Sequence, residues 1–380
     1  MRILHTVQRY APDSGGSEEV VRQLSEYLVS FGHEVTVATS RSARRGSRQI
    51  NGVRIEEFNC AGNSVDGIRG EVKAYQNFIL QADVDIMMNY AAQIWSSDLV
   101  FDLLPSLRKK KVLLPCGYSQ LHNPAYREYF DRMPDILRLY DKVIYLSDNY
   151  IDKDFADRHG LTNHAVIPNG ADKREFTNVP NGAFRNKFQL DGRPILLNVS
   201  NHSLLKNHSF FWNCLRMLDR KTFAPVLIAS AYRSGPSKWL TQCYAACRWD
   251  AIRLEALILE NLPRSEVVKA FVDADIFIFG SKIECSPLVM FEAFAGKTLF
   301  ITTDCGNVKD YSDIVCIVRN EHEAVEIVKD FYYHPEAYTQ RLERGYANFL
   351  QKLNWEYIAR QYEQLYAGLL DSAAHTMSKE

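Results

Sequence analysis

The strongest constraint on the fold is a repeated alternation of short apolar runs with segments of helical pattern. Residues 275–280 show it well, because a nearly continuous apolar run there is followed by a polar loop and then by a second apolar segment that ends at Gly296. A continuous run without polar alternation is typical of a strand buried on both faces, as in a parallel sheet. Repeated strand–loop–helix units of this kind predict an α/β protein with doubly wound parallel sheets.

The same pattern recurs in both halves of the chain. Further strands are predicted at residues 2–7, 34–39, 84–89, 111–115, 142–147, 165–172, 193–200, 224–230, 256–259, 298–303 and 314–318. Helices are predicted at 18–31, 94–107, 236–247, 264–273 and 354–370. Because 380 residues exceed one ordinary core, we expect two domains, 1–175 and 176–353, with a polar linker near 173–193.

Composition excludes several functional classes. An apolar fraction of 46% with 24% charged residues is that of a globular protein, and a net charge of −1 argues against a general nucleic-acid partner. No stretch approaches the ~20 apolar residues that span a bilayer, and residues 1–7 are too short for a signal peptide. A cytoplasmic location is expected.

The eight cysteines are scattered, and only Cys243 and Cys247 lie close together. The sequence around them offers no partner ligands in the spacing of a zinc knuckle. We therefore expect reduced thiols buried in the core, and no metal site.

Two carboxylates, Glu284 and Glu292, stand eight positions apart around a predicted helix start. Ser286 is a favourable N-cap residue, and Pro287 suits the first helical turn. The next two amides should then be available to an anion; they belong to Leu288 and Val289. This arrangement predicts a ligand that carries phosphate and has hydroxyl groups at both ends.

A glycine pair, Gly15 and Gly16, follows the first predicted strand. Its spacing does not fit the dinucleotide-binding pattern of three glycines. By itself the pair indicates either a flexible turn or a place where the backbone approaches a ligand.

Four motifs, taken in order, resemble glycosyltransferase family 4, whose members are retaining, nucleotide-sugar-dependent enzymes of the GT-B type. They are the Gly15–Gly16 loop with the helix that follows it, residues 167–172, the segment from Glu284 to Glu292 with residues 293–297, and residues 354–356. The resemblance covers nearly the whole chain. It implies two Rossmann-like domains facing a central cleft, with an acceptor-binding N-terminal domain and a donor-binding C-terminal domain. The last helix, within 354–380, would pack back towards the N-terminal domain.

The resemblance also implies roles for the residues that match the family motifs. Glu292 would bind the donor ribose, the loop from Ser286 to Val289 would hold the diphosphate, and Glu284 would contact the transferred sugar. Lys206 would neutralise the leaving diphosphate, and the loop of Gly15 and Gly16 would close on the same phosphates. The family needs no bound metal or other cofactor, and this chain offers no carboxylate cluster suited to magnesium.

Two positions depart from the family pattern. Many members have a histidine where this chain has Cys116, and His122 is the nearest candidate to replace it. Members also carry an arginine shortly before the lysine, where this chain has Asn201 and His202. Besides an active glycosyltransferase, the departures leave open a non-catalytic nucleotide-binding scaffold and, with less support, a nucleotide-sugar epimerase.

The expected partners are a nucleotide-sugar donor and a saccharide or lipid-linked acceptor. Basic clusters at 41–48 and 108–111 lie in the half that binds acceptors in the family. They allow peripheral contact with an anionic inner membrane face, or they belong to a solvated loop and a helix C-terminus.

Overall fold

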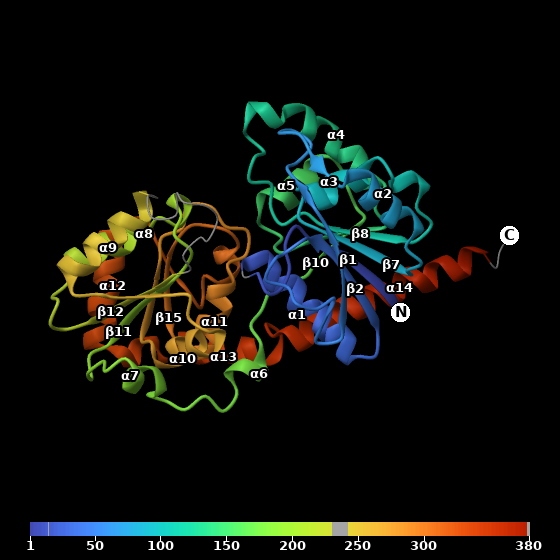
Figure 1. Cartoon of the computed structure of the whole chain (residues 1–380). Coiled ribbons are helices and arrows are strands. Elements are labelled where there is room, and N and C mark those ends of the chain that lie inside the picture. Colours follow the sequence, from blue (N-terminus) through green and yellow to red (C-terminus); the bar gives the residue numbers. More distant parts are fainter. Residues whose placement is uncertain (14, 230–241, 378–380) are drawn as a thin grey trace. The chain divides into compact units, whose positions relative to one another are not determined.

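The computed structural model describes residues 1–13, 15–229 and 242–377, and it divides the chain into two compact units (Figure 1). Unit 1 comprises Met1–Asn169 together with Trp355–Glu380, and unit 2 comprises Gly170–Asn354. The sequence pattern placed the corresponding boundaries after residues 175 and 353.

Unit 1 is built on a sheet of eight strands in the order β10-β9-β8-β7-β1-β2-β4-β3. The strands are β1 (Arg2–Thr6), β2 (Glu34–Ser40), β3 (Gln49–Ile50), β4 (Val53–Phe58), β7 (Ile86–Tyr90), β8 (Lys110–Leu114), β9 (Lys142–Tyr145) and β10 (His164–Val166). All pairs are parallel except β3 with β4. A separate ribbon joins β5 (Cys60–Ala61) to β6 (Arg69–Gly70).

Helices connect the strands of unit 1, as parallel pairing requires. They are α1 (Gly16–Ser30), α2 (Val72–Gln81), α3 (Trp95–Phe101), α4 (Arg127–Arg138), α5 (Ile151–Arg158) and α14 (Trp355–Met377), with short 3₁₀ turns η1 (Leu104–Ser106) and η2 (Pro124–Tyr126). Helix α14 is separated from the rest of unit 1 by the whole of unit 2 in sequence, yet it belongs to unit 1 and packs against α1.

Unit 2 contains a parallel sheet of six strands in the order β13-β12-β11-β14-β15-β16. The strands are β11 (Ile195–Val199), β12 (Ala224–Ala229), β13 (Leu257–Glu260), β14 (Ile276–Phe279), β15 (Leu299–Thr303) and β16 (Cys316–Val318). The helices are α6 (Lys173–Phe176), α7 (Ala183–Lys187), α8 (His208–Arg216), α9 (Gln242–Leu254), α10 (Arg264–Asp273), α11 (Leu288–Gly296), α12 (Glu321–Tyr333) and α13 (Thr339–Gln351), with 3₁₀ turns η3 (Leu204–Lys206), η5 (Val308–Tyr311) and η6 (Pro335–Tyr338).

The central strand β14 shows why its sequence is continuously apolar. Ile276 and Ile278 pack into one core cluster, which includes Phe211 of α8. Their neighbours Phe277 and Phe279 pack into a second cluster, with residues of α11 and α13. Successive side chains of a strand point to opposite faces, so a strand covered on both faces needs apolar residues at every position.

The prediction of a polar linker at residues 173–193 is wrong. The segment contains α6 and α7, and Phe184 of α7 is completely buried. The carboxylate of Asp273 accepts hydrogen bonds from the amides of Gly182, Phe184 and Arg185, at 2.6, 2.7 and 3.0 Å. These bonds satisfy the first amides of α7 and tie the segment to the end of α10.

Two predicted helices differ in extent. The helix expected over 94–107 ends at Phe101, and a 3₁₀ turn containing Pro105 follows, since proline has no amide hydrogen with which to continue an α-helix. The helix expected near 236–247 is observed as α9, and residues 236–241 lie outside the described residues, as does Ser230 of the strand expected to end there. The sequence pattern gave no sign of β4, α2 or α4.

Within the described residues, no helix is long and apolar enough to cross a bilayer.

Candidate functional site

Lys206 and Glu284, which the motifs nominated from distant parts of the sequence, are in contact in unit 2. Lys206 ends the 3₁₀ turn that follows β11, and Glu284 lies in the loop that follows β14. Lys206 Nζ lies 2.6 Å from Glu284 Oε1, which also accepts a hydrogen bond from Ser281 Oγ at 2.7 Å. Ligands of open α/β sheets bind outside the carboxyl ends of the strands, and both residues are placed there.

Hydrogen bonds between the two loops hold this pair in position. The amide of Lys282 donates to the carbonyl of Leu205 at 2.9 Å, and Asn207 Nδ2 donates to the carbonyl of Gly280 at 2.9 Å. Because β11 and β14 are adjacent in the sheet, the loops that leave them form one connected surface.

Helix α11 begins directly after this loop, but its cap differs from the prediction. The N-cap residue is Pro287, with φ −68° and ψ 118°, rather than Ser286, and no side chain caps the helix. Proline fixes φ near the value that extended backbone also adopts, so it can end the loop as well as begin a helix. The amides of Leu288 and Val289 are therefore the first helical amides and have no acceptor within the helix.

This end of α11 carries the positive end of the helix dipole. Amides that lack helical acceptors and a positive dipole end together favour an anion such as phosphate. The residue types from Ser286 to Val289 thus still suit the diphosphate role predicted for them, although Ser286 is not the cap.

Glu292 lies on α11 and is buried, with a positive partner that the sequence did not reveal. Arg264 Nη1 lies 2.5 Å from Glu292 Oε1, and Arg264 Nη2 lies 2.6 Å from Glu175 Oε2. Arg264 is the first residue of α10, where a positive charge is disfavoured by the helix dipole. That unfavourable position is the one sequence signal that could have indicated a specific acidic partner.

Gly15 and Gly16 form the start of α1 in unit 1. Gly15 is the N-cap residue, and a Cβ atom there would lie 2.3 Å from Glu18 Oε2. Glu18 is buried and forms an ion pair with Arg9 at 2.7 Å. A Cβ at Gly15 would therefore require the Glu18 carboxylate to move, whereas a Cβ at Gly16 would meet no atom within 4 Å.

Cys116 follows β8 and adopts a left-handed conformation, with φ 59°. Its Sγ lies 3.5 Å from Tyr90 Oη. The next amide, that of Gly117, donates to Asp152 Oδ2 at 2.8 Å, and burial raises the pKa of Asp152 to about 6.

His122, the residue predicted as a replacement for the family histidine, is exposed. It lines an open pocket of about 370 Å³ together with Phe130 and Arg127.

The basic clusters of unit 1 are largely neutralised within the chain. In the first cluster, Arg41 pairs with Glu71, Arg44 with Asp13 and Arg45 with Glu57. In the second, Lys109 Nζ donates to carbonyls at the end of α2, while Lys110 and Lys111 pair with Asp141. The basic side chains of both clusters therefore bind partners within unit 1.

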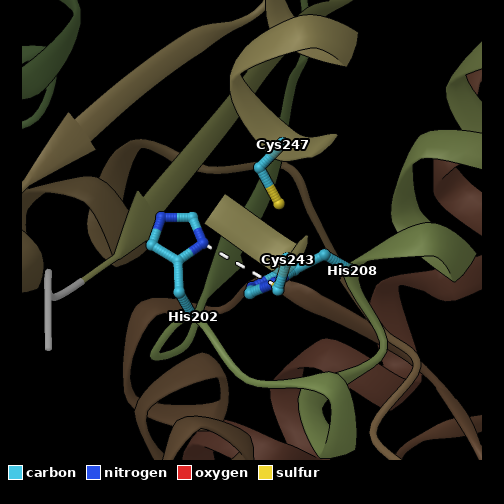
Figure 2. A group of neighbouring side chains, drawn as sticks. All are labelled: His202, His208, Cys243 and Cys247. Carbon is cyan, nitrogen blue, oxygen red and sulfur yellow. Dashed lines mark hydrogen bonds between the residues drawn. The ribbon is translucent and has the colours of Figure 1, made fainter. Parts of the chain in front are cut away.

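Asn201 is exposed, but His202 beside it is buried and lies near two cysteines (Figure 2). His202 Nδ1 lies 3.9 Å from Cys243 Sγ. The expectation that Cys243 and Cys247 lack partner ligands is wrong, because His202 and His208 both lie beside them. Sequence spacing could not show this, since the loop after β11 and helix α9 meet only through the fold.

Comparison with known proteins finds a family match in the first part of the chain. Residues 14–175 match the sequence model of Glycosyltransferase Family 4. The resemblance to glycosyltransferase family 4 is confirmed. A search of curated proteins finds no match in sequence.

Solved glycosyltransferase structures match both units of the chain. Sucrose-phosphate synthase from Thermosynechococcus elongatus superposes with a TM-score of 0.81 at 16% identity, over 98% of this chain and 99% of that one. HepE from Anabaena, solved in complex with UDP, gives a TM-score of 0.76 at 14% identity, over 97% and 100%. A glycosyltransferase from Rickettsia africae gives 0.75 at 18% identity, over 97% and 98%. The predicted GT-B fold is confirmed.

Proposed function

We propose that the protein is a retaining glycosyltransferase that moves a sugar from a nucleoside diphosphate to a hydroxyl group of a saccharide or lipid-linked acceptor. The observation that carries the proposal is the contact of Lys206 with Glu284 beside the uncapped start of α11. The match of residues 14–175 to Glycosyltransferase Family 4 and the ligands named for the similar HepE structures, UDP and UDP-glucose, support a donor of this class.

The proposed chemistry assigns complementary tasks to the two carboxylates and the lysine. Glu292 accepts hydrogen bonds from the ribose hydroxyls, as an ionised carboxylate can from a diol. Lys206 and the first amides of α11 stabilise the negative charge that develops on the leaving diphosphate, in place of a bound metal ion. Glu284 contacts the transferred sugar.

The observed ion pair can persist when the donor binds. Lys206 Nζ has three donor hydrogens, so it can bind a phosphate oxygen while keeping one bond to Glu284 Oε1. Glu284 in turn keeps its bond from Ser281 and is held towards the sugar. The pair therefore aligns Lys206 before the donor arrives, and this alignment reduces the reorganisation needed during the reaction.

Substitution of the two carboxylates tests these assignments. Glu284→Gln should reduce sugar transfer by at least about 10²-fold, the usual cost of losing a group that acts on developing charge, while nucleotide binding stays measurable. Glu292→Ala should weaken nucleotide binding itself. Release of nucleoside diphosphate measures turnover, and calorimetric titration with UDP and GDP measures binding.

Glu326→Gln is a matched control, because Glu326 lies in the same unit, is exposed and pairs only with Lys329 among the described ion pairs. It should leave both measurements unchanged. Turnover at the parent rate in both Glu284→Gln and Glu292→Ala would show that the site assignment is wrong.

A non-catalytic scaffold is the second candidate, and Cys116 favours it. A thiol replaces the histidine that many family members carry there, and it cannot supply the same hydrogen bond to a donor sugar or acceptor. Tight nucleotide binding without turnover of any donor would support this candidate, whereas interconversion of donors without acceptor would indicate an epimerase. A thermal-shift screen of UDP, GDP and ADP derivatives identifies the donors to assay, since binding stabilises the native state.

A further inference from the structure

Four side chains that could each bind a metal meet inside unit 2. They form the Cys/His cluster, defined as His202, His208, Cys243 and Cys247, and all four are buried. One ligand atom from each lies within 4.8 Å of those of the others. Figure 2 shows the four side chains gathered in one place, with a ring nitrogen of His202 turned towards Cys243.

The four residues of the cluster come from two helices and one loop. Cys243 and Cys247 are four residues apart on α9, so their side chains lie on the same face of the helix. His208 is the first residue of α8, and His202 lies in the loop that follows β11.

The distances suit tetrahedral coordination. His208 Nδ1 lies 3.2 Å and His202 Nδ1 lies 3.9 Å from Cys243 Sγ. Zinc bonds of ~2.3 Å to sulfur and ~2.0–2.1 Å to nitrogen place tetrahedral sulfur and nitrogen ligands about 3.5 Å apart. The two observed distances lie on either side of that value.

A chain of hydrogen bonds determines which nitrogen of His208 carries a lone pair. Asn198 Nδ2 donates to the carbonyl of Ile278 at 2.8 Å, so Asn198 Oδ1 must be the acceptor for Ser200 Oγ, also at 2.8 Å. Ser200 Oγ has then used its hydrogen, and it accepts from His208 Nε2 at 2.7 Å. In a neutral imidazole the remaining nitrogen, Nδ1, has the lone pair, and it faces the cluster.

The other ligands have supporting partners of the type seen around metal sites. His202 Nε2 lies 3.9 Å from Glu260 Oε1, and both atoms are buried without a hydrogen-bond partner among the described residues. A carboxylate behind the second nitrogen of a histidine is a common support for a metal ligand. Trp212 Nε1 donates to Cys247 Sγ at 3.3 Å, and an indole can only donate, so it favours the thiolate form.

We propose that the Cys/His cluster binds one zinc ion in a closed, structural site. Two thiolates and two imidazoles in a tetrahedral set are typical zinc ligands, and a site with four protein ligands leaves no open position for catalysis. The ion would join the loop 200–207 and the start of α8 to α9, and Lys206 lies within that loop between the two histidines. The site thus stabilises the backbone that carries Lys206 without contacting the donor.

Metal content and cobalt spectroscopy test the proposal on the whole 380-residue chain. Protein purified with a thiol reductant and without chelator should contain about one zinc per chain, because four protein ligands form a closed tetrahedral site. Cobalt(II) added to the zinc-free protein should give the intense thiolate-to-metal charge-transfer absorption of a site with two cysteines. Removal of zinc by a chelator should lower Tm, since metal binding stabilises the folded state.

Three variants distinguish a metal site from a metal-free cluster of core thiols. Cys247→Ser should lose the bound zinc and weaken the cobalt charge-transfer band. Glu260→Gln should keep the ligands but lower zinc affinity about 10- to 100-fold, the usual effect of losing a supporting partner. Cys316→Ser is the matched control, since Cys316 is a buried cysteine of unit 2 outside the cluster, and it should retain zinc.

The proposal is overturned if the unaltered protein contains no zinc after zinc is supplied and gives no charge-transfer band with cobalt. That measurement needs no variant, so it decides the question even if Cys247→Ser fails to fold. Retention of zinc by Cys247→Ser at the level of Cys316→Ser would overturn it as well.

Discussion

Gly306 lies where the loop after β15 meets the loop that carries Glu284. Its φ is +59°, and a Cβ atom there would lie 2.8 Å from the carbonyl oxygen of Cys285 and 3.1 Å from Glu284 Cβ. Gly306→Ala should therefore displace the Glu284 loop and add the cost of a left-handed alanine, about 1 kcal/mol or more. We expect a lower Tm together with a loss of transfer activity, measured by thermal unfolding and donor turnover.

Gly192→Ala is the control for this substitution, because Gly192 has no positive φ and a Cβ there meets no atom within 4 Å. It should leave both measurements close to the parent values. Unchanged turnover in Gly306→Ala would show that the close contact does not position Glu284.

Among single residues, the sequence indicates candidate site residues only where they belong to a short motif of consecutive positions. Glu284, Glu292 and Lys206 could be nominated as candidates because the family motifs that they match are short and ordered, and their roles remain predictions. Arg264 was missed because its contact with Glu292 joins two helices, and single-sequence patterns carry no information on such pairs. The partners of Cys243 were missed for the same reason.

At the scale of elements, the sequence predicted the strands and helices of the α/β alternation better than their ends. Helix α11 is an example. Its predicted end at Gly296 is confirmed, but its start is at Leu288 after Pro287, and the left-handed conformation that follows the helix is adopted by Lys297, with φ 56°. Gly296 is instead required by packing, since a Cβ there would lie 2.5 Å from the Phe271 carbonyl oxygen. A glycine near a helix end can serve either purpose, and only the fold decides between them.

Asp152, in the first turn of helix α5, makes the stability of the protein depend on pH. Burial raises the pKa of Asp152 from 3.8 to about 6, against opposing hydrogen bonds from the amides of Gly117 and Lys153. A raised carboxyl pKa gives stability that is present below about pH 4 and is lost as pH rises through about 6. Asp152→Asn removes this titration, so its stability relative to the parent should rise by up to roughly 3 kcal/mol between pH 4 and pH 7.5.

Urea unfolding at several pH values measures this difference. Glu128→Gln, at an exposed position of α4 in the same unit, is the control and should show no comparable rise. A flat difference for Asp152→Asn would contradict the assignment of this pH dependence to Asp152.

At the scale of the whole molecule, the chain returns to its first unit after completing the second. Helix α14 follows unit 2 in sequence, yet it belongs to unit 1 (Figure 1). Its residue Tyr366 is fully buried, and its hydroxyl lies 3.4 Å from His5 Nε2 and 3.2 Å from Met88 Sδ. The core of unit 1 is therefore complete only when residues more than 350 positions from β1 have been added.

Substitution of Tyr366 should reveal this dependence. Tyr366→Ala leaves a cavity beside β1 and β7 and should cost about 3–5 kcal/mol of the stability of unit 1. Hydrogen exchange should become faster in β1, β7 and α1, and should remain unchanged in β11 and β14, because those strands have their own core. Tyr357→Ala, on the same helix but exposed, should change stability by no more than about 0.5 kcal/mol. Equal acceleration of exchange in both units would mean that the two cores unfold together, so that α14 supports the whole molecule rather than unit 1.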